Sequence, residues 1–116
     1  MHEFSICQGL VKAILSELKK LDPPNPKLVK ASVVIGRLRQ IIPETLQSSY
    51  EALTKDTAIA GSKLQIINAP IIARCPNCGW EGEIKENHFR CGKCGCGEIE
   101  LSGGMELYLN NLTVEK

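Results

Sequence analysis

Hydrophobic positions near the start of the chain repeat with the spacing of a helix. Polar side chains such as Lys12 and Glu17 fall between them, which predicts an amphipathic helix. Its apolar stripe is expected to consist of Ile6, Leu10, Ala13, Ile14, Leu18 and Leu21. Ser5 is the expected cap, because its hydroxyl suits the free amide groups at a helix start. The proline-rich residues 22–26 end the helix.

A strand and a second helix are predicted next. Apolar positions alternate over residues 29–35 and are rich in β-branched side chains, which predicts a strand that ends near Gly36. The pair Pro43-Glu44 then indicates a helix start, because proline suits the first helical position. The buried stripe of this second helix is expected to consist of Leu46, Tyr50 and Leu53.

Two further predicted strands flank a cysteine-rich stretch. Residues 64–69 form one of them, and Pro70 ends it. Residues 105–109 alternate in the other, and the phase then slips to Leu112 and Val114, which indicates either a bulge or a strand buried on both faces. The predicted fold class is therefore α+β, with a small sheet packed by two helices and an inserted four-cysteine module. The closing strand is expected to return to the same sheet.

The uneven distribution of cysteines predicts two domains. Five of the six cysteines lie between residues 75 and 96, and only Cys7 lies outside that stretch. We expect an α/β domain formed by residues 1–73 with 103–116, and a zinc-ribbon domain formed by residues 74–102.

Composition and charge narrow the classes of function. A net charge of +1 and an aromatic content of 4% give little basis for direct contact with nucleic acid. No apolar run of about 18 residues predicts a membrane span. The first residues lack the pattern of a secretory signal, so we expect a cytoplasmic protein, in which cysteines bind metal more often than they form disulfides. No paired-carboxylate, phosphate-loop or Ser/His/Asp pattern indicates an enzyme.

Four cysteines have the spacing of a metal site. Each of the pairs Cys75/Cys78 and Cys91/Cys94 is separated by two residues and followed by a glycine, which is the pattern of a zinc knuckle. Two knuckles supply four thiolates, so we predict a structural zinc ion with no open position for a substrate. Binding of the metal should contribute most of the folding free energy of this module.

Other interpretations of the cysteines remain open. A rubredoxin-like iron site uses the same knuckles, although such proteins are rich in aromatic residues. A redox dithiol needs a helix directly after the CxxC pair, where this chain has glycine. Cys96 is interpreted as a spare thiol with a minor prospect of ligand exchange. Cys7 is interpreted as a small buried hydrophobic residue with no metal role.

A histidine in the second position offers a further metal site. The amine of Met1, the backbone nitrogen of His2 and the His2 imidazole lie within chelating reach of one ion. Ni²⁺ and Cu²⁺ favour such tetragonal nitrogen ligation, and a fourth ligand must come from elsewhere. Taken alone, an N-terminal histidine is more often a solvated side chain.

The order of these motifs resembles a known family over essentially the whole chain. Met-His-Glu at the start, Ser5 opening a helix, the segments 35–38 and 43–46, and two CxxCG knuckles before a closing strand occur in this order. Together they resemble the HypA/HybF family of hydrogenase nickel-incorporation proteins. The resemblance implies a metallochaperone that carries Ni(II) at its N-terminus, with His2 as the key ligand, and that holds a structural Zn(II) at the four cysteines.

The resemblance also implies partners and further nickel-site residues. Members pass nickel to a HypB-type maturation GTPase and onward to the large subunit of NiFe hydrogenase, and some support urease. Glu3 matches the acidic third position of the family and is expected to assist nickel binding or partner contact. Many members carry acidic residues near the segment 35–38, where this chain has Val34 and Arg37, so this strand offers no carboxylate as a fourth ligand.

His88 is the only other histidine, and two interpretations of it stay open. It is a surface loop residue, or it completes the nickel site and couples that site to the zinc module. The alternative function is a zinc-ribbon interaction module for a protein or nucleic-acid partner. A monomer or weak homodimer is expected.

Overall fold

The computed structural model describes residues 2–85 and 88–115. The elements follow in the order α1 (His2–Lys19), β1 (Lys27–Gly36), the 3₁₀ helix η1 (Arg37–Arg39), α2 (Pro43–Thr54), β2 (Lys63–Ala69), β3 (Ile71–Arg74), β4 (Glu81–Ile84), β5 (Glu100–Gly103) and β6 (Leu107–Glu115). The mixture of helices and antiparallel strands confirms the α+β prediction. None of the helices in the described ranges is long and apolar enough to cross a membrane.

The chain forms two compact units, which are described separately. Unit 1 consists of Met1–Val34, Ile41–Ile67 and Tyr108–Lys116, and unit 2 consists of Ile35–Gln40 and Asn68–Leu107. The domain ranges inferred from the cysteine distribution stay a prediction.

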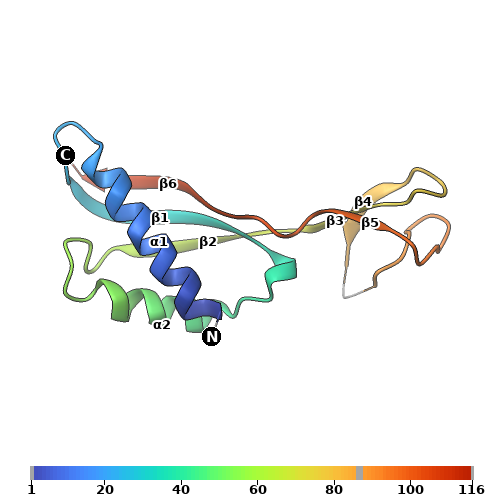
Figure 1. Ribbon diagram of the computed structural model, residues 1–116, viewed down its shortest axis with the longest axis horizontal. Coiled ribbons are helices and arrows are strands. Elements are labelled where there is room, and N and C mark those ends of the chain that lie inside the picture. Colours follow the sequence, from blue (N-terminus) through green and yellow to red (C-terminus); the bar gives the residue numbers. More distant parts are fainter. Residues whose placement is uncertain (1, 86–87, 116) are drawn as a thin grey trace. The chain divides into compact units, whose positions relative to one another are not determined.

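Unit 1 is a three-stranded sheet with two helices. The strand order is β2-β1-β6, so the closing strand returns to the first sheet as expected. In Figure 1, α1 crosses over the strands, and α2 packs beside α1. The core lies between these elements and is aliphatic, with Tyr50 as its one large aromatic residue. Its fully buried members include Ile14, Val33, Leu46, Tyr50 and Ile59.

Helix α1 begins before the predicted cap. It starts at His2, so Ser5 lies inside the helix, and the prediction of Ser5 as its cap is wrong. The buried stripe consists of Cys7, Leu10, Val11, Ile14 and Leu18. Ala13 and Leu21 are exposed, which corrects the predicted stripe. Cys7 and Val11 share the buried face because they lie three to four residues from the next buried positions.

Strand β1 departs from simple alternation. Val29 is 42% exposed, whereas every residue from Ala31 to Gly36 is buried. The strand lies in the centre of its sheet, so its second half is covered on both faces. The predicted start of α2 at Pro43 is confirmed, and its buried residues are Leu46, Tyr50 and Thr54. Leu53, predicted in that stripe, is half-buried.

Strand β6 begins later than predicted and has one polar face. Met105 lies outside β6 and is 58% exposed. None of the β6 residues in the described range is fully buried, so the interpretation as a strand buried on both faces is wrong. The consecutive exposed residues Asn110 and Asn111 account for the phase slip, as a bulge would.

Unit 2 contains a second three-stranded sheet. The order is β4-β3-β5, and both neighbours of β3 are antiparallel to it. The buried core is small and consists of Ile71, Ala73 and Ile84, against which Leu38, Trp80 and Ile99 pack. So small a core cannot supply much stability by itself.

Residues 35–40, which include the last two residues of β1, belong to unit 2. The amide of Gly36 donates to the carbonyl oxygen of Glu106 at 2.7 Å, and the amide of Leu38 donates to that of Gly104 at 2.9 Å. The Arg39 Nε donates to the carbonyl oxygen of Met105 at 2.8 Å. This segment is therefore held along the residues that connect β5 to β6.

Candidate metal centre

Two tight turns of the same kind place the four cysteines. The amide of Gly79 donates to the carbonyl oxygen of Cys75 at 2.9 Å, and the amide of Gly95 donates to that of Cys91 at 3.2 Å. Both glycines adopt a left-handed backbone, with φ of 80° and 76°. Glycine adopts this conformation without a steric penalty, so the CxxCG sequence itself directs the two turns.

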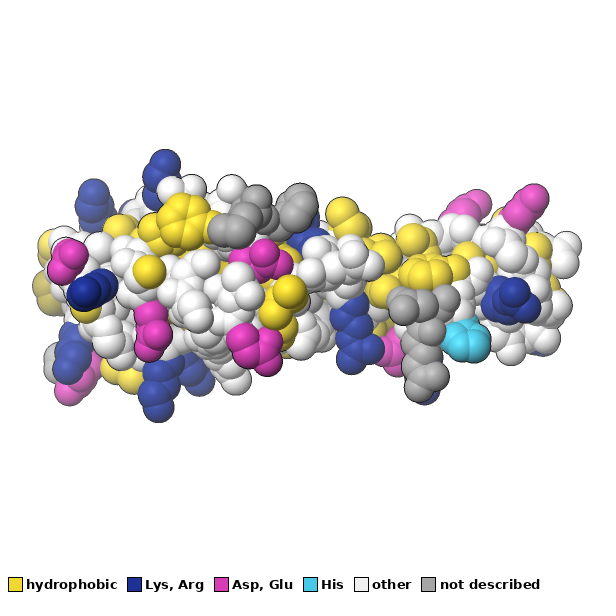
Figure 2. Space-filling model, turned by 90° about the horizontal axis from the view of Figure 1, so that it is seen from below, with side chains coloured by type: hydrophobic (Ala, Val, Ile, Leu, Met, Phe, Trp, Pro, Cys, Tyr) yellow, Lys and Arg dark blue, Asp and Glu magenta, His cyan; other side chains and the backbone are white. Residues whose placement is uncertain are grey.

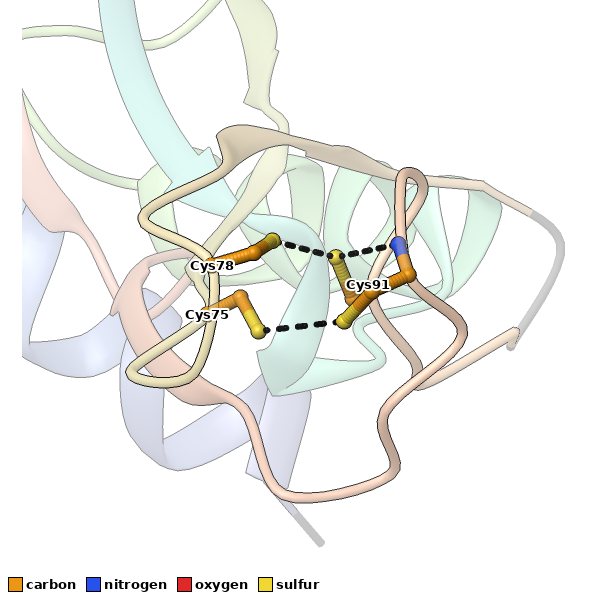
Figure 3. Close-up of side chains that lie close together, drawn as sticks. Cys75, Cys78 and Cys91 are labelled. Atoms are coloured by element: carbon orange, nitrogen blue, oxygen red, sulfur yellow. Dashed lines mark hydrogen bonds between the residues drawn. The ribbon is translucent and has the colours of Figure 1, made fainter.

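The two turns face each other and bring four sulfur atoms together. Cys75 and Cys78, from the first turn, point toward the second turn and Cys91 (Figure 3). The sulfurs of Cys75 and Cys94 are 3.7 Å apart, and those of Cys78 and Cys91 are 3.4 Å apart. All four sulfur atoms lie within 4.8 Å of one another.

Backbone amides and neighbouring thiols give the cysteines unequal acidity. Burial acts to raise the pKa of Cys91, but the amides of Cys94 and Lys93 donate to its sulfur at 3.2 Å each, and its pKa falls to about 6. At Cys78 the Trp80 amide is the largest single influence and lowers the pKa, but the Cys91 thiol, burial and the Cys75 and Cys94 thiols together outweigh it, and the pKa rises to about 12. Crowded sulfurs do not all ionise without a cation among them.

The donor set fits a tetrahedral metal ion. Zinc binds cysteine sulfur at about 2.3 Å, and tetrahedral geometry then sets neighbouring sulfurs about 3.8 Å apart. The sulfur separations of 3.7 and 3.4 Å are close to that spacing. Four soft sulfur donors leave no position for a substrate, so the site is suited to a structural metal.

The fifth thiol of this region, Cys96, has a backbone role. Its carbonyl oxygen accepts the amide of Cys91 at 2.8 Å, just as the carbonyl oxygen of Trp80 accepts the amide of Cys75 at 2.7 Å in the first turn. Cys96 therefore occupies the place in the second turn that Trp80 occupies in the first. Its sulfur is half-buried and accepts the amide of Glu98 at 3.4 Å.

Thiol labelling should separate three classes of cysteine. Once the four sulfurs hold a metal, we expect one rapidly reacting thiol per chain, that of Cys96. A chelator should expose the four ligand thiols. Cys7 should react only in denaturant, because it is fully buried and burial raises its pKa to about 11. Timed reaction with a disulfide reagent at pH 8 measures these numbers, and Cys96→Ser should remove the rapid class. Two or more rapid thiols in the metal-loaded protein would contradict this assignment.

The residues predicted for nickel lie in different parts of the structure. Met1 and the side chain of His2 are outside the described part, and the backbone of His2 begins α1. Glu3 lies in the first turn of α1 in unit 1, and its Oε2 accepts a hydrogen bond from the amide of Ile42 at 3.3 Å. His88 belongs to unit 2 and is exposed after β4, where its amide donates to the carbonyl oxygen of Lys85 at 3.0 Å. The structure brings the four cysteines together, while the nickel set stays a prediction.

Two residues around the cysteines were not singled out from the sequence. Asn77 directs its Nδ2 toward the Cys94 sulfur at 3.9 Å. The ring of Trp80 lies so close to Gly82 and Gly92 that an added methyl group at either glycine would lie 2.6 or 2.8 Å from it. The only sequence signal for both is their position inside or directly after the first CxxCG turn.

Comparisons with known proteins identify the family of the chain. The family described as "Hydrogenase/urease nickel incorporation, metallochaperone, hypA" matches residues 1–114. The hydrogenase maturation factor HypA of Desulfosudis oleivorans is 32% identical over 120 positions, which cover 100% of both chains. Hydrogenase maturation factor HypA 2 of Bradyrhizobium diazoefficiens is 33% identical over 118 positions, which cover 99% of this chain and 100% of that one.

A solved structure shares the fold. The solution structure of the nickel metallochaperone HypA from Helicobacter pylori matches with a TM-score of 0.64 and 20% identity, and the match covers 97% of this chain and 96% of that one. The family match over residues 1–114 and the two sequence relatives establish the family, and the structural likeness confirms the α+β fold. The chain belongs to the HypA family of nickel metallochaperones for hydrogenase maturation.

Proposed function

We propose that this protein binds Ni(II) as its cargo at the N-terminus and delivers it during the maturation of NiFe hydrogenase. The observation that best supports this proposal is the family match over residues 1–114, together with the histidine at position 2. The Met1 amine, the His2 backbone nitrogen and the His2 imidazole would supply three corners of a square-planar site. A site on a chain end is open to stepwise ligand exchange, which suits transfer to a partner.

The other nickel-site residues have more limited roles in this proposal. Glu3 assists the terminus, and its contact with the Ile42 amide supports a role in holding the start of α1 beside the start of α2. His88 is the candidate for the fourth corner, because it is an exposed imidazole in a loop. The recipients are a HypB-type GTPase and the hydrogenase large subunit, and urease maturation is a further destination.

Zinc is the proposed resident metal at Cys75, Cys78, Cys91 and Cys94. The sulfur spacing and the closed donor set support it. Its role is structural, because it would join two turns that share only a small hydrophobic core. Metal analysis and colour distinguish this proposal from an iron site, since zinc thiolate is colourless and ferric thiolate is red.

Nickel titration tests the cargo site. Zinc-loaded protein with an authentic Met1 should bind one nickel per chain with a square-planar nitrogen-ligand absorption spectrum. His2→Ala, or an extension ahead of Met1 that turns the amine into an amide, should remove that spectrum while zinc stays bound. Affinity should fall as the pH is lowered, because the nitrogen ligands bind only when deprotonated.

Two variants, His88→Ala and His2→Ala, distinguish the possible results of the nickel titration. His88→Ala should weaken binding if the imidazole is the fourth ligand, and unchanged affinity and spectrum would remove His88 from the site. Equal, weak binding by the wild type and His2→Ala would reject the nickel proposal and leave the metal centre in place.

An interaction module for nucleic acid is the weaker candidate. On the face shown in Figure 2, acidic and basic side chains are interspersed, and no field of one sign covers it. Together with the net charge of +1, this gives no electrostatic footprint for a phosphate backbone.

A further inference from the structure

Both edge strands of the sheet in unit 2, β4 and β5, have β3 as their one neighbour among the described residues, and β5 is the edge that lies beside an apolar groove. Among the described residues, β5 pairs with β3 alone, through Ala73↔Leu101 and Arg74↔Glu100. An edge strand leaves alternate backbone amide and carbonyl groups unpaired, and these groups bind an added strand. Natural edges are often protected by lysine or proline, and residues 100–103 contain neither.

An apolar groove accompanies this edge. It has a volume of about 310 Å³ and is lined by Leu38, Leu101, Ser102, Gly103, Met105 and Glu106. Leu101 is 47% exposed and Met105 is 58% exposed. Leucine and methionine gain free energy when covered, so two such side chains beside an open edge favour an apolar occupant.

Among the described residues that line the groove, Glu106 alone carries a charged side chain. Its Oε1 accepts the amide of Gly104 at 2.8 Å, which fixes the carboxylate there. Within the described ranges, its Oε2 has no hydrogen-bond partner. The Nε of the neighbouring Arg39 donates to the carbonyl oxygens of Met105 and Glu106 at 2.8 and 3.3 Å, and among the described residues Arg39 forms no ion pair with the Glu106 carboxylate. The carboxylate is therefore available to a cation from outside.

We propose that the β5 edge and this groove bind an extended segment of a partner protein, with an apolar side chain in the groove and a lysine or arginine beside Glu106. Backbone pairing would supply affinity, and the groove and the carboxylate would supply specificity. The proposal goes beyond nickel binding and assigns a docking surface in unit 2.

A partner protein fits this surface better than a second copy of this chain. Residues 95–115 contain Glu98, Glu100, Glu106 and Glu115 but no lysine or arginine. Two copies paired through β5 would place like charges together, which is unfavourable. A basic, apolar strand would place opposite charges there instead.

Peptide binding to the full-length, zinc-loaded chain tests the proposal. The probe is an end-capped octapeptide of alternating valine and lysine, and its twin carries glutamate in place of lysine. With ¹⁵N-labelled protein, we expect the basic peptide to shift and protect the amides of residues 100–106, and the acidic twin to leave them unchanged. Leu101→Lys should weaken binding about tenfold or more, because it removes the apolar contact and adds a like charge.

A matched variant and the opposing results complete the test. Ile67→Lys changes an exposed apolar residue on the edge strand β2 of unit 1, and it should bind the peptide as the wild type does. Equal zinc content confirms that each variant is folded, and Met105→Ser is the second test if Leu101→Lys loses zinc. Equal binding of both peptides, or shifts centred on β2, β4 or β6, would overturn the proposal. Self-association in sedimentation that Leu101→Lys abolishes would reassign the surface to a second copy and also overturn it.

Discussion

Cys91→Ser should lose the metal and unfold unit 2 while the helices of unit 1 remain. The Cys91 sulfur is 3.4 Å from that of Cys78 and accepts two backbone amides, so its removal opens the centre of the site. Among the described residues, the hydrophobic core cluster of unit 2 consists of Ile71, Ala73 and Ile84. Structural zinc contributes about 10–16 kcal/mol of apparent binding free energy in zinc-finger peptides, far more than such a core provides.

Three measurements check this result. Metal content should fall from one zinc per chain to none, and the fluorescence of Trp80, the only tryptophan, should shift toward that of a solvated ring. Helical circular dichroism should persist, because α1 and α2 both belong to unit 1. Cys96→Ser is the matched control and should retain zinc. A Cys91→Ser protein that still holds one tightly bound zinc would show that Cys96 replaces the lost ligand.

Local signals were sufficient where one residue type fixes the backbone. Pro43 marked the start of α2 and Pro70 the end of β2, because proline removes an amide donor and fixes φ. Gly79 and Gly95 marked the two knuckle turns for the corresponding reason. The cysteine cluster could therefore be predicted from spacing alone, before any sheet was known.

Other features depended on contacts that no local pattern contains. The start of α1 was misplaced because Ser5 suits a cap, while the helix continues to His2 with the acidic Glu3 in its first turn, where it complements the helix dipole. Strands β3, β4 and β5 have four residues each, too few to show a period. The pairing of Arg39 with Met105 spans 66 positions of sequence.

Gly36→Ala should disrupt unit 2 even though alanine suits the local backbone. Gly36 has φ of −72° and ψ of 143°, an ordinary extended conformation. A Cβ atom there would overlap the carbonyl group of Gly104 and lie 2.6 Å from the nitrogen of Met105. These are backbone atoms, so no side-chain rotation relieves the clash. The backbone at Gly36 and the backbone at Gly104 and Met105 must therefore move apart. Overpacking of this kind costs about 1–3 kcal/mol or more.

The cost has a specific structural origin. Separation would break the hydrogen bonds from Gly36 to Glu106 and from Leu38 to Gly104, each worth about 0.5–1.5 kcal/mol. Urea unfolding of the zinc-loaded protein, followed by Trp80 fluorescence, should show a lower midpoint. Gly97→Ala is the matched control, because nothing lies within 4 Å of the added atom and its φ is outside the left-handed region. Equal midpoints for the two variants would mean that residues 35–40 are not packed along residues 104–106 in solution. A lower midpoint for Gly36→Ala alone would show that this segment, which contains the end of β1 and η1, is a structural part of the metal-binding unit.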